Sequence, residues 1–206
     1  TRDAGQLAGL DVLRILNDPT AAEISSGAPR PPDGRRLIAV FDLGGGTFDI
    51  SIMSVENGIF EVLATGGDTA LGGEDWDRRM LEHIVDEVFD QHRVDLTGVP
   101  IAMSRLREAC EAAKKALSVD RDALVQLPFL ANDQHGAPIN YEHRITRDTV
   151  EQLTADLLSR VEAPCRRALE DARLRAEDIE EVLLVGGMTR WPAVQDMVER
   201  IFGKHP

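Results

Sequence analysis

The sequence predicts an α/β fold with a smaller α+β subdomain inserted into it, and three observations lead to this class. Three strand-like runs follow one another closely from residue 37, and two long amphipathic stretches then interrupt the strand pattern. The last third returns to a helix, strand, helix order. With 206 residues, 43% of them hydrophobic, the chain can bury the core of one large unit or of two small ones.

The first elements lead into a meander of strands. Residues 4–16 space their apolar side chains at helical intervals and predict a helix, whereas residues 17–36 gather Pro, Gly and Ser and predict a flexible connection. Because only ENG (residues 56–58) separates two of the strand-like runs, we expect a tight hairpin turn and an antiparallel meander. The three strands are predicted at LIAVFDL (37–43), TFDISIMSV (47–55) and IFEVLATGG (59–67).

The rest of the chain supplies the inserted part and the closing elements. Residues 74–92 and 101–118 predict two long helices, and residues 123–130 and 136–146 predict short strands around a polar loop. The last elements are predicted as a helix over 147–172, a strand over 180–187 and a helix over 192–203. Pro192 suits the first turn of that last helix, and Gly203 suits its C-terminal cap.

Charge and cysteine content narrow the classes of function. A net charge of −13 argues against a protein that binds nucleic acid or an anionic membrane surface, because both reward lysine and arginine. Cys110 and Cys165 lie in amphipathic helical patterns without metal-ligand spacing, so we expect buried, reduced thiols and a cytoplasmic setting. The histidines show no metal-binding spacing, and no apolar run approaches a membrane span. The abrupt start and end suggest a piece of a longer protein.

The segment FDLGGGTFDI raises the question of why three glycines separate two strands. A P-loop or a dinucleotide fingerprint would open a helix, but here the glycines lead into a strand. The remaining interpretation is a hairpin whose bare backbone, at Gly44, Gly45 and Gly46, lets an anion approach the amide groups. The alternative is an ordinary tight hairpin with acids facing solvent.

Strand alternation places the polar residues of this hairpin on one side. Phe48, Ile50 and Ile52 share the face that can enter the core, whereas Thr47 and Asp49 take the other face. Asp42 ends the preceding strand and closes the other side of the hairpin. Two carboxylates and a hydroxyl would repel a bare triphosphate, but they suit a phosphate that carries Mg²⁺ or K⁺.

These residues resemble a known family. FDLGGGTFDISI, followed by FEVLATGGDTALGGEDWD, is similar to the second phosphate-binding segment of the DnaK-type chaperones, the 70-kDa heat-shock family of the actin-like ATPase superfamily. NDPTAA, AMSRLREACEAAKKALS and VLLVGGMTRWPAVQ resemble further segments of that family, in the same order. The resemblance implies the second lobe of a nucleotide-binding domain, with a ribonuclease H-like core. By this resemblance, residues 1–36 are a remnant of the first lobe with the connecting segment. Residues 37–72 and 145–206 form a core α/β subdomain, and residues 73–144 form an inserted helical subdomain.

The resemblance also implies roles for the residues around the glycines. Asp42 would position Mg²⁺ and its waters, and Asp49 would be a ligand of K⁺. The three glycines and Thr47 would contact the phosphates of ATP or ADP. The family's NEPTAA glutamate is replaced by Asp18, one methylene shorter, which is expected to weaken hydrolysis or signalling between the lobes. The residues with an implied catalytic role are therefore Asp42, Thr47 and Asp18.

Two further segments are assigned to the adenosine. On residues 101–118, an apolar stripe lies beside a polar group that is either a solvated helix flank or, by the resemblance, an adenosine contact. The segment VLLVGGMTRWP is either a generic strand-to-helix turn or the opposite wall, where an arginine stacks on the base. The residues with an implied adenosine role are Glu111, Lys114, Lys115, Ser118, Gly186, Gly187, Met188 and Arg190.

The function that the resemblance implies is the ATP-binding half of a chaperone motor in the stress response and protein folding. In the parent, nucleotide would change the affinity for unfolded polypeptides in a separate substrate domain, with a J-domain co-chaperone and a GrpE-like exchange factor as partners. The first phosphate loop has no counterpart here, so we expect no efficient hydrolysis by this chain alone. Alternatives are a docking module for exchange factors at 73–144, a sugar kinase, an actin-like filament protein or an HscA-type iron–sulfur assembly chaperone.

Overall fold

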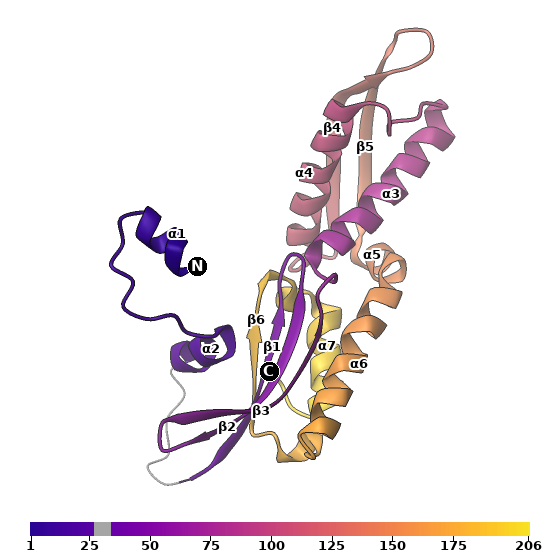
Figure 1. Ribbon diagram of the computed structural model, residues 1–206. Coiled ribbons are helices and arrows are strands. Elements are labelled where there is room, and N and C mark those ends of the chain that lie inside the picture. Colours follow the sequence, from indigo (N-terminus) through magenta and orange to yellow (C-terminus); the bar gives the residue numbers. More distant parts are fainter. Residues whose placement is uncertain (27–33) are drawn as a thin grey trace.

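The computed structural model describes residues 1–26 and 34–206, and it shows two β-sheets joined to helices (Figure 1). The larger sheet has the strand order β3-β2-β1-β6. β1 to β3 form an antiparallel meander, and β6 pairs in parallel with β1. The mixed α/β class and the meander are therefore confirmed. The strands span Arg36–Leu43 (β1), Phe48–Glu56 (β2), Ile59–Asp68 (β3) and Glu181–Val185 (β6).

The hairpin between β2 and β3 has the predicted tight turn. Asn57 and Gly58 have φ values of 50° and 77°, so both central residues adopt the left-handed conformation that a two-residue hairpin loop requires. The predicted alternation of β2 is also confirmed, since Phe48, Ile50 and Ile52 are all fully buried in the main core.

Helices cover the two faces of the larger sheet unequally. α6 (Ala155–Asp171) and α7 (Pro192–Phe202) pack on the face that carries the main core. α2 (Asp18–Ser26) lies against the other face, where Ile38, Val40, Met53 and Val55 form a small second cluster. That second face also carries the side chains of Asp42 and Asp49, so it is the face that positions the candidate site.

The second sheet belongs to the part of the chain predicted as an insertion. It pairs β4 (Asp122–Asn132) with β5 (Pro138–Thr146). α3 (Gly73–His92) and α4 (Pro100–Leu117) lie alongside this hairpin, and all four elements extend away from the larger sheet (Figure 1). The predicted apolar stripe of α4 is confirmed, because its members are all buried: Leu106, Cys110, Ala113 and Leu117.

The predictions for the N-terminal segment were wrong in two respects. The helix expected over residues 4–16 is only α1 (Arg2–Leu7), because Gly9 turns to a φ of 78° and the following leucines find no packing surface in the described chain. The connection expected over residues 17–36 contains helix α2, which begins with an acidic residue and a proline, both favourable in a first turn. Residues 27–33 of that connection lie outside the described residues.

The helix predicted over residues 147–172 is also interrupted. It forms α5 (Arg147–Leu153) and α6, separated at Thr154, whose hydroxyl donates a hydrogen bond to the carbonyl oxygen of Val150 at 2.7 Å. Such a bond competes with the helical backbone and permits the break. The final helix is as predicted, since Pro192 begins α7 and Gly203 caps it with a φ of 69°.

Two smaller expectations concern the cysteines and the membrane. Cys110 and Cys165 are both buried free thiols, as the helical patterns predict. Among the helices that the structure describes, none combines the length and the apolar character needed to cross a membrane.

Candidate functional site

The glycine loop, residues 44–46, joins β1 to β2 and is held in place through its carbonyl groups. The amide of Gly44 donates to the Thr47 oxygen at 3.0 Å. The oxygens of Gly44 and Gly45 accept hydrogen bonds from the amides of Gly73 and Glu74 at 2.9 and 2.8 Å. The first amides of α3 therefore fasten the loop, whereas the amides of Gly45 and Gly46 donate no hydrogen bond within residues 1–26 and 34–206.

The protein's own packing does not require glycine at these three positions. None of them has a positive φ. A methyl group on Gly46 would meet no heavy atom within 4 Å, and on Gly44 or Gly45 it would make ordinary contacts at 3.7 and 3.9 Å. At Gly72, by contrast, a methyl group would lie 2.4 Å from the backbone of the loop. The bare outer surface of the glycine loop is thus explained by approach of a ligand better than by internal sterics.

Three carboxylates, those of Asp18, Asp42 and Asp49, line a pocket between the start of α2 and the larger sheet. Asp42 and Asp49 are directly opposite each other in the β1–β2 ladder, and Asp18 approaches from the start of α2. Burial, followed by the negative charges of Asp18 and Asp49, raises the pKa of Asp42 above its usual range. The pocket has a volume of about 490 Å³, and the hydroxyl residues Ser51 and Thr65 also line it.

The oxygen ligands in this pocket suit a hard cation with a partial protein shell. Carboxylates and waters are the ligands that Mg²⁺ prefers, and a cation would relieve the repulsion between Asp42 and Asp49. Among the described residues, no group of three or more His, Cys, Asp or Glu side chains is arranged to hold a metal alone. Asp42 and Asp49 could therefore supply only part of the ligands of such a cation, and water or a bound ligand could supply the others.

On α4, the structure divides the four residues assigned to adenosine into two environments. The exposed Lys115 pairs with Glu111 at 2.7 Å, and the Ser118 hydroxyl donates to a backbone oxygen of its own helix at 3.3 Å. Lys114, however, is buried, and its Nζ donates to Asp77 Oδ2 at 2.6 Å and to the Gly73 oxygen at 2.8 Å.

Sequence reasoning missed Asp77, although a signal was present. Asp77 lies four residues after Gly73 and four before Leu81, on the stripe of α3 whose members are otherwise buried. Lys114 likewise lies four residues after the buried Cys110. Opposite charges on the apolar stripes of two neighbouring helices predict a buried ion pair.

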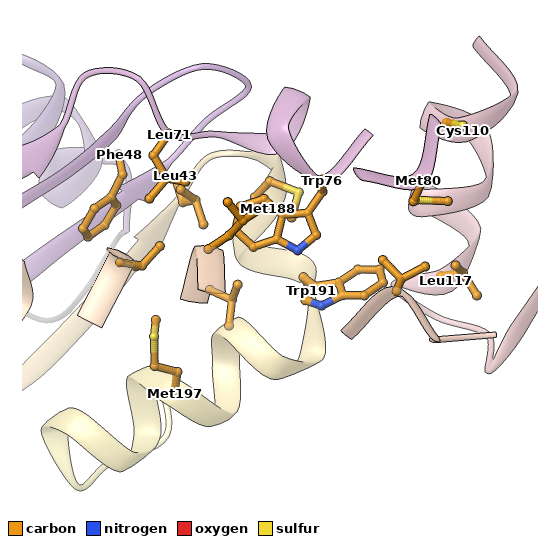
Figure 2. Close-up of a cluster of buried hydrophobic side chains, with 14 of the residues drawn as sticks. Leu43, Phe48, Leu71, Trp76, Met80, Cys110, Leu117, Met188, Trp191 and Met197 are labelled. Atoms are coloured by element: carbon orange, nitrogen blue, oxygen red, sulfur yellow. The ribbon is translucent and has the colours of Figure 1, made fainter. Parts of the chain in front are cut away.

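The turn after β6 is built around a second close backbone approach. Gly186 has a φ of 91°, and a methyl group there would lie 2.2 Å from the Leu43 oxygen. In the short helix η2 (Gly187–Arg190), Gly187 and Arg190 are exposed, whereas the side chain of Met188 is buried. Figure 2 shows Met188 beside Trp76, so this residue supplies packing, and Arg190 is left as the side chain available for stacking.

The start of α3 brings these segments together. Gly73 is bonded to the glycine loop and to Lys114, and a methyl group on it would lie 2.9 Å from Met188 Cγ. The glycine loop, helix α4 and η2 thus converge on one residue.

The sequence was compared with known protein families and with curated relatives. The family model described as Hsp70 protein matches residues 1–206. The chain belongs to the Hsp70 family. This Hsp70 chain is 50% identical over 206 residues to the heat shock protein hsp-6 of Caenorhabditis elegans, an alignment that covers 100% of the chain and 31% of the relative. It therefore corresponds to part of an Hsp70 chaperone, a family whose members bind ATP.

Proposed function

We propose that this chain is the ATP- and ADP-binding second lobe of an Hsp70 nucleotide-binding domain, with the actin-like, ribonuclease H-like fold. The observation that carries the proposal is the glycine loop. Its Gly45 and Gly46 amides donate no hydrogen bond within the described residues, and the loop joins the strand ends that carry the opposed carboxylates Asp42 and Asp49. In the intact parent, nucleotide binding and hydrolysis would control the binding and release of unfolded polypeptides, with a J-domain co-chaperone as partner.

Each group at the phosphate end has a separate task. The amides of Gly45 and Gly46 and the exposed hydroxyl of Thr47 donate hydrogen bonds to phosphate oxygens. Asp42 orients the waters of Mg²⁺, and Asp49 is a ligand of K⁺. When bound, these cations neutralise charge on the phosphate oxygens. Asp18, on the first turn of α2, reaches the same pocket from the side of the first lobe.

The adenosine end is assigned to exposed groups. Arg190 offers a planar guanidinium that stacks on the base, and Gly187, with no heavy atom within 4 Å of a methyl group placed on it, leaves the backbone open to the base. Gly186 contributes by permitting the tight turn against Leu43 that positions this segment. Glu111, Lys115 and Ser118 supply hydrogen-bonding groups on α4. Met188 and Lys114 are buried in the nucleotide-free chain. We therefore propose that they act by packing and by positioning, and not as direct contacts of the nucleotide.

The proposal also includes the rate of hydrolysis, the division into subdomains and the cellular setting of the chain. A chain with one half of the phosphate cradle binds nucleotide but hydrolyses it slowly, because phosphoryl transfer needs donors from both sides. The core subdomain is proposed at 37–72 plus 145–206, with the insertion at 73–144, and the two separate sheets support this division. Two buried free thiols are compatible with the reducing, cytoplasmic setting proposed for this chain.

Calorimetry with ADP and Mg²⁺ tests the proposal. We expect micromolar affinity for the wild-type chain and about tenfold or greater weakening in Arg190→Ala, from the loss of a desolvated cation–π contact. Arg167→Ala, which removes an exposed arginine on α6, is the matched control and should bind like the wild type. No heat of binding with the folded wild-type chain would refute the proposal, and turnover near that of an intact Hsp70 would refute the half-cradle argument.

A second function, docking of a GrpE-like exchange factor on residues 73–144, is favoured by one observation. Phe129 has a φ of 51° and is 72% exposed. Its amide donates to Asn140 at 2.8 Å, and Arg105 donates to the oxygens of Pro128 and Phe129 at 2.7 and 2.9 Å. An aromatic side chain held outward by a strained backbone is typical of an interaction anchor.

Binding of a GrpE-like protein to surface-immobilised chain would test the docking function. Phe129→Ala should weaken binding about tenfold, as expected for loss of an aromatic anchor. Ile59→Ala, which removes an exposed apolar side chain outside residues 73–144, should leave binding unchanged. Equal binding by both variants would refute the role of Phe129.

A further inference from the structure

The buried ion pair between Asp77 of α3 and Lys114 of α4 is the feature that the proposed function leaves unexplained. The two side chains are only 18% and 11% exposed, and their closest atoms are 2.6 Å apart. Lys114 Nζ has a second acceptor, the Gly73 oxygen at 2.8 Å. The ammonium group thus donates to two protein oxygens in the interior, and it is not presented to solvent as a free cation.

The pair is not explained by a gain in stability. Burial is the largest influence on Asp77, and it raises the pKa of this carboxyl in spite of the hydrogen bond from Lys114. A carboxylate whose desolvation outweighs the attraction of its partner contributes little net stability. Buried pairs of this kind are better explained by the geometry that they impose.

That geometry reaches both ends of the nucleotide site through one residue. Gly73, whose oxygen accepts from Lys114, donates its own amide to Gly44 at 2.9 Å. A methyl group on Gly73 would lie 3.0 Å from Lys114 Nζ and 2.9 Å from Met188 Cγ. The glycine loop, α4 and η2 therefore meet at Gly73, where an additional carbon atom would require the side chain of Met188 or Lys114 to shift.

We propose that Asp77 is a positioning residue of the nucleotide site. It holds Lys114 in the interior, and Lys114 in turn holds the Gly73 carbonyl, so that the first turn of α3 fastens the glycine loop at a fixed spacing from Arg190. The consequence for nucleotide rests on the proposed function. The consequence for the order of residues 72–74 does not, because it concerns the free chain.

Two readouts on the complete chain test this role. In the nucleotide-free chain, Asp77→Asn should accelerate amide hydrogen exchange of residues 72–74 about tenfold, since the local structure there loses a buried restraint. ADP affinity, measured by calorimetry, should fall by about tenfold, because the donors of the glycine loop are no longer held in the binding geometry. Asp86→Asn removes the same charge from an exposed position of α3 and should change neither quantity.

A double variant separates positioning from stability. In Asp77→Leu/Lys114→Leu, apolar side chains fill the space of the pair, so urea denaturation should show stability at or above that of the wild type. Exchange at residues 72–74 should nevertheless stay fast, because the Gly73 oxygen has lost its donor. If Asp77→Asn does not fold, this double variant provides the exchange measurement.

The outcomes distinguish this proposal from the proposed function. Wild-type exchange rates at residues 72–74 in both Asp77 variants would overturn the positioning role, whatever the affinity for ADP. Fast exchange in the variants, together with a wild-type chain that does not bind ADP, would support the positioning role and refute the proposed function alone. Equal ADP affinity in wild type and Asp77→Asn would overturn the effect on the nucleotide site.

Discussion

Replacing Asp42 with asparagine is expected to stabilise the nucleotide-free chain while it damages the proposed cation site. Asp42 lies opposite Asp49 in the β1–β2 ladder, where like charges cost roughly 0.2–1 kcal/mol. Burial and the charges of Asp18 and Asp49 raise the pKa of Asp42, so its carboxylate is disfavoured in the folded state. Asparagine keeps the shape and removes the charge. The free energy of unfolding at neutral pH should therefore rise by up to about 1 kcal/mol, and Tm by up to about 4 °C.

The pH dependence of this gain has a definite sign. Because folding raises the pKa of Asp42, the folded chain binds this proton more tightly than the unfolded chain, and ionisation costs stability. The cost is fully present above the raised pKa and absent below the ordinary carboxyl value of about 4. The advantage of Asp42→Asn over the wild type should therefore be largest at neutral pH and should shrink on acidification.

Urea denaturation followed by circular dichroism, at neutral pH and at about pH 4, measures the difference in unfolding free energy between Asp42→Asn and the wild type. Asp68→Asn is the matched control on the neighbouring strand β3. The amide of Ala70 first, and then Arg160, lower the pKa of Asp68, so this carboxylate contributes stability that is lost as the pH falls. The control variant should therefore be less stable than the wild type at neutral pH. A loss of stability in Asp42→Asn as well would refute the argument from charge repulsion.

Two further predictions concern glycine packing and thiol burial. Gly72→Ala places a methyl group 2.4 Å from the Gly45 backbone and should cost about 1–3 kcal/mol of unfolding free energy. Gly46→Ala, with open space around it, should leave Tm within about 2 °C and still weaken ADP binding; similar melting shifts for the two variants would contradict the packing. Burial raises the pKa of both Cys110 and Cys165 to about 12, so iodoacetamide should label them slowly at about pH 8 until urea unfolds the chain. Mass spectrometry that finds rapid labelling of the folded chain would contradict the burial.

The local patterns predicted most of the elements because a strand or helix that buries one face has apolar residues at the period of its own geometry. α3, α4 and the three strands of the meander begin and end within one residue of the predicted bounds. The helix over residues 4–16 failed for the complementary reason. Periodicity indicates which face could be buried, but Leu7 and Leu13 are 90% and 86% exposed, so packing does not stabilise a longer helix.

The candidate site divides in the same way between local and long-range information. Strand alternation is a rule for adjacent residues, and for that reason the sequence already placed Asp42, Thr47 and Asp49 around the glycine loop. Asp77 and Lys114 are separated by 37 residues and Gly72 and Gly45 by 27, and their contacts exist only because α3 packs against both α4 and the loop. Close packing between distant segments depends on the whole fold. The helical stripes mark Asp77 and Lys114 as candidates for burial, but only the tertiary structure pairs them with each other and brings Gly72 against Gly45.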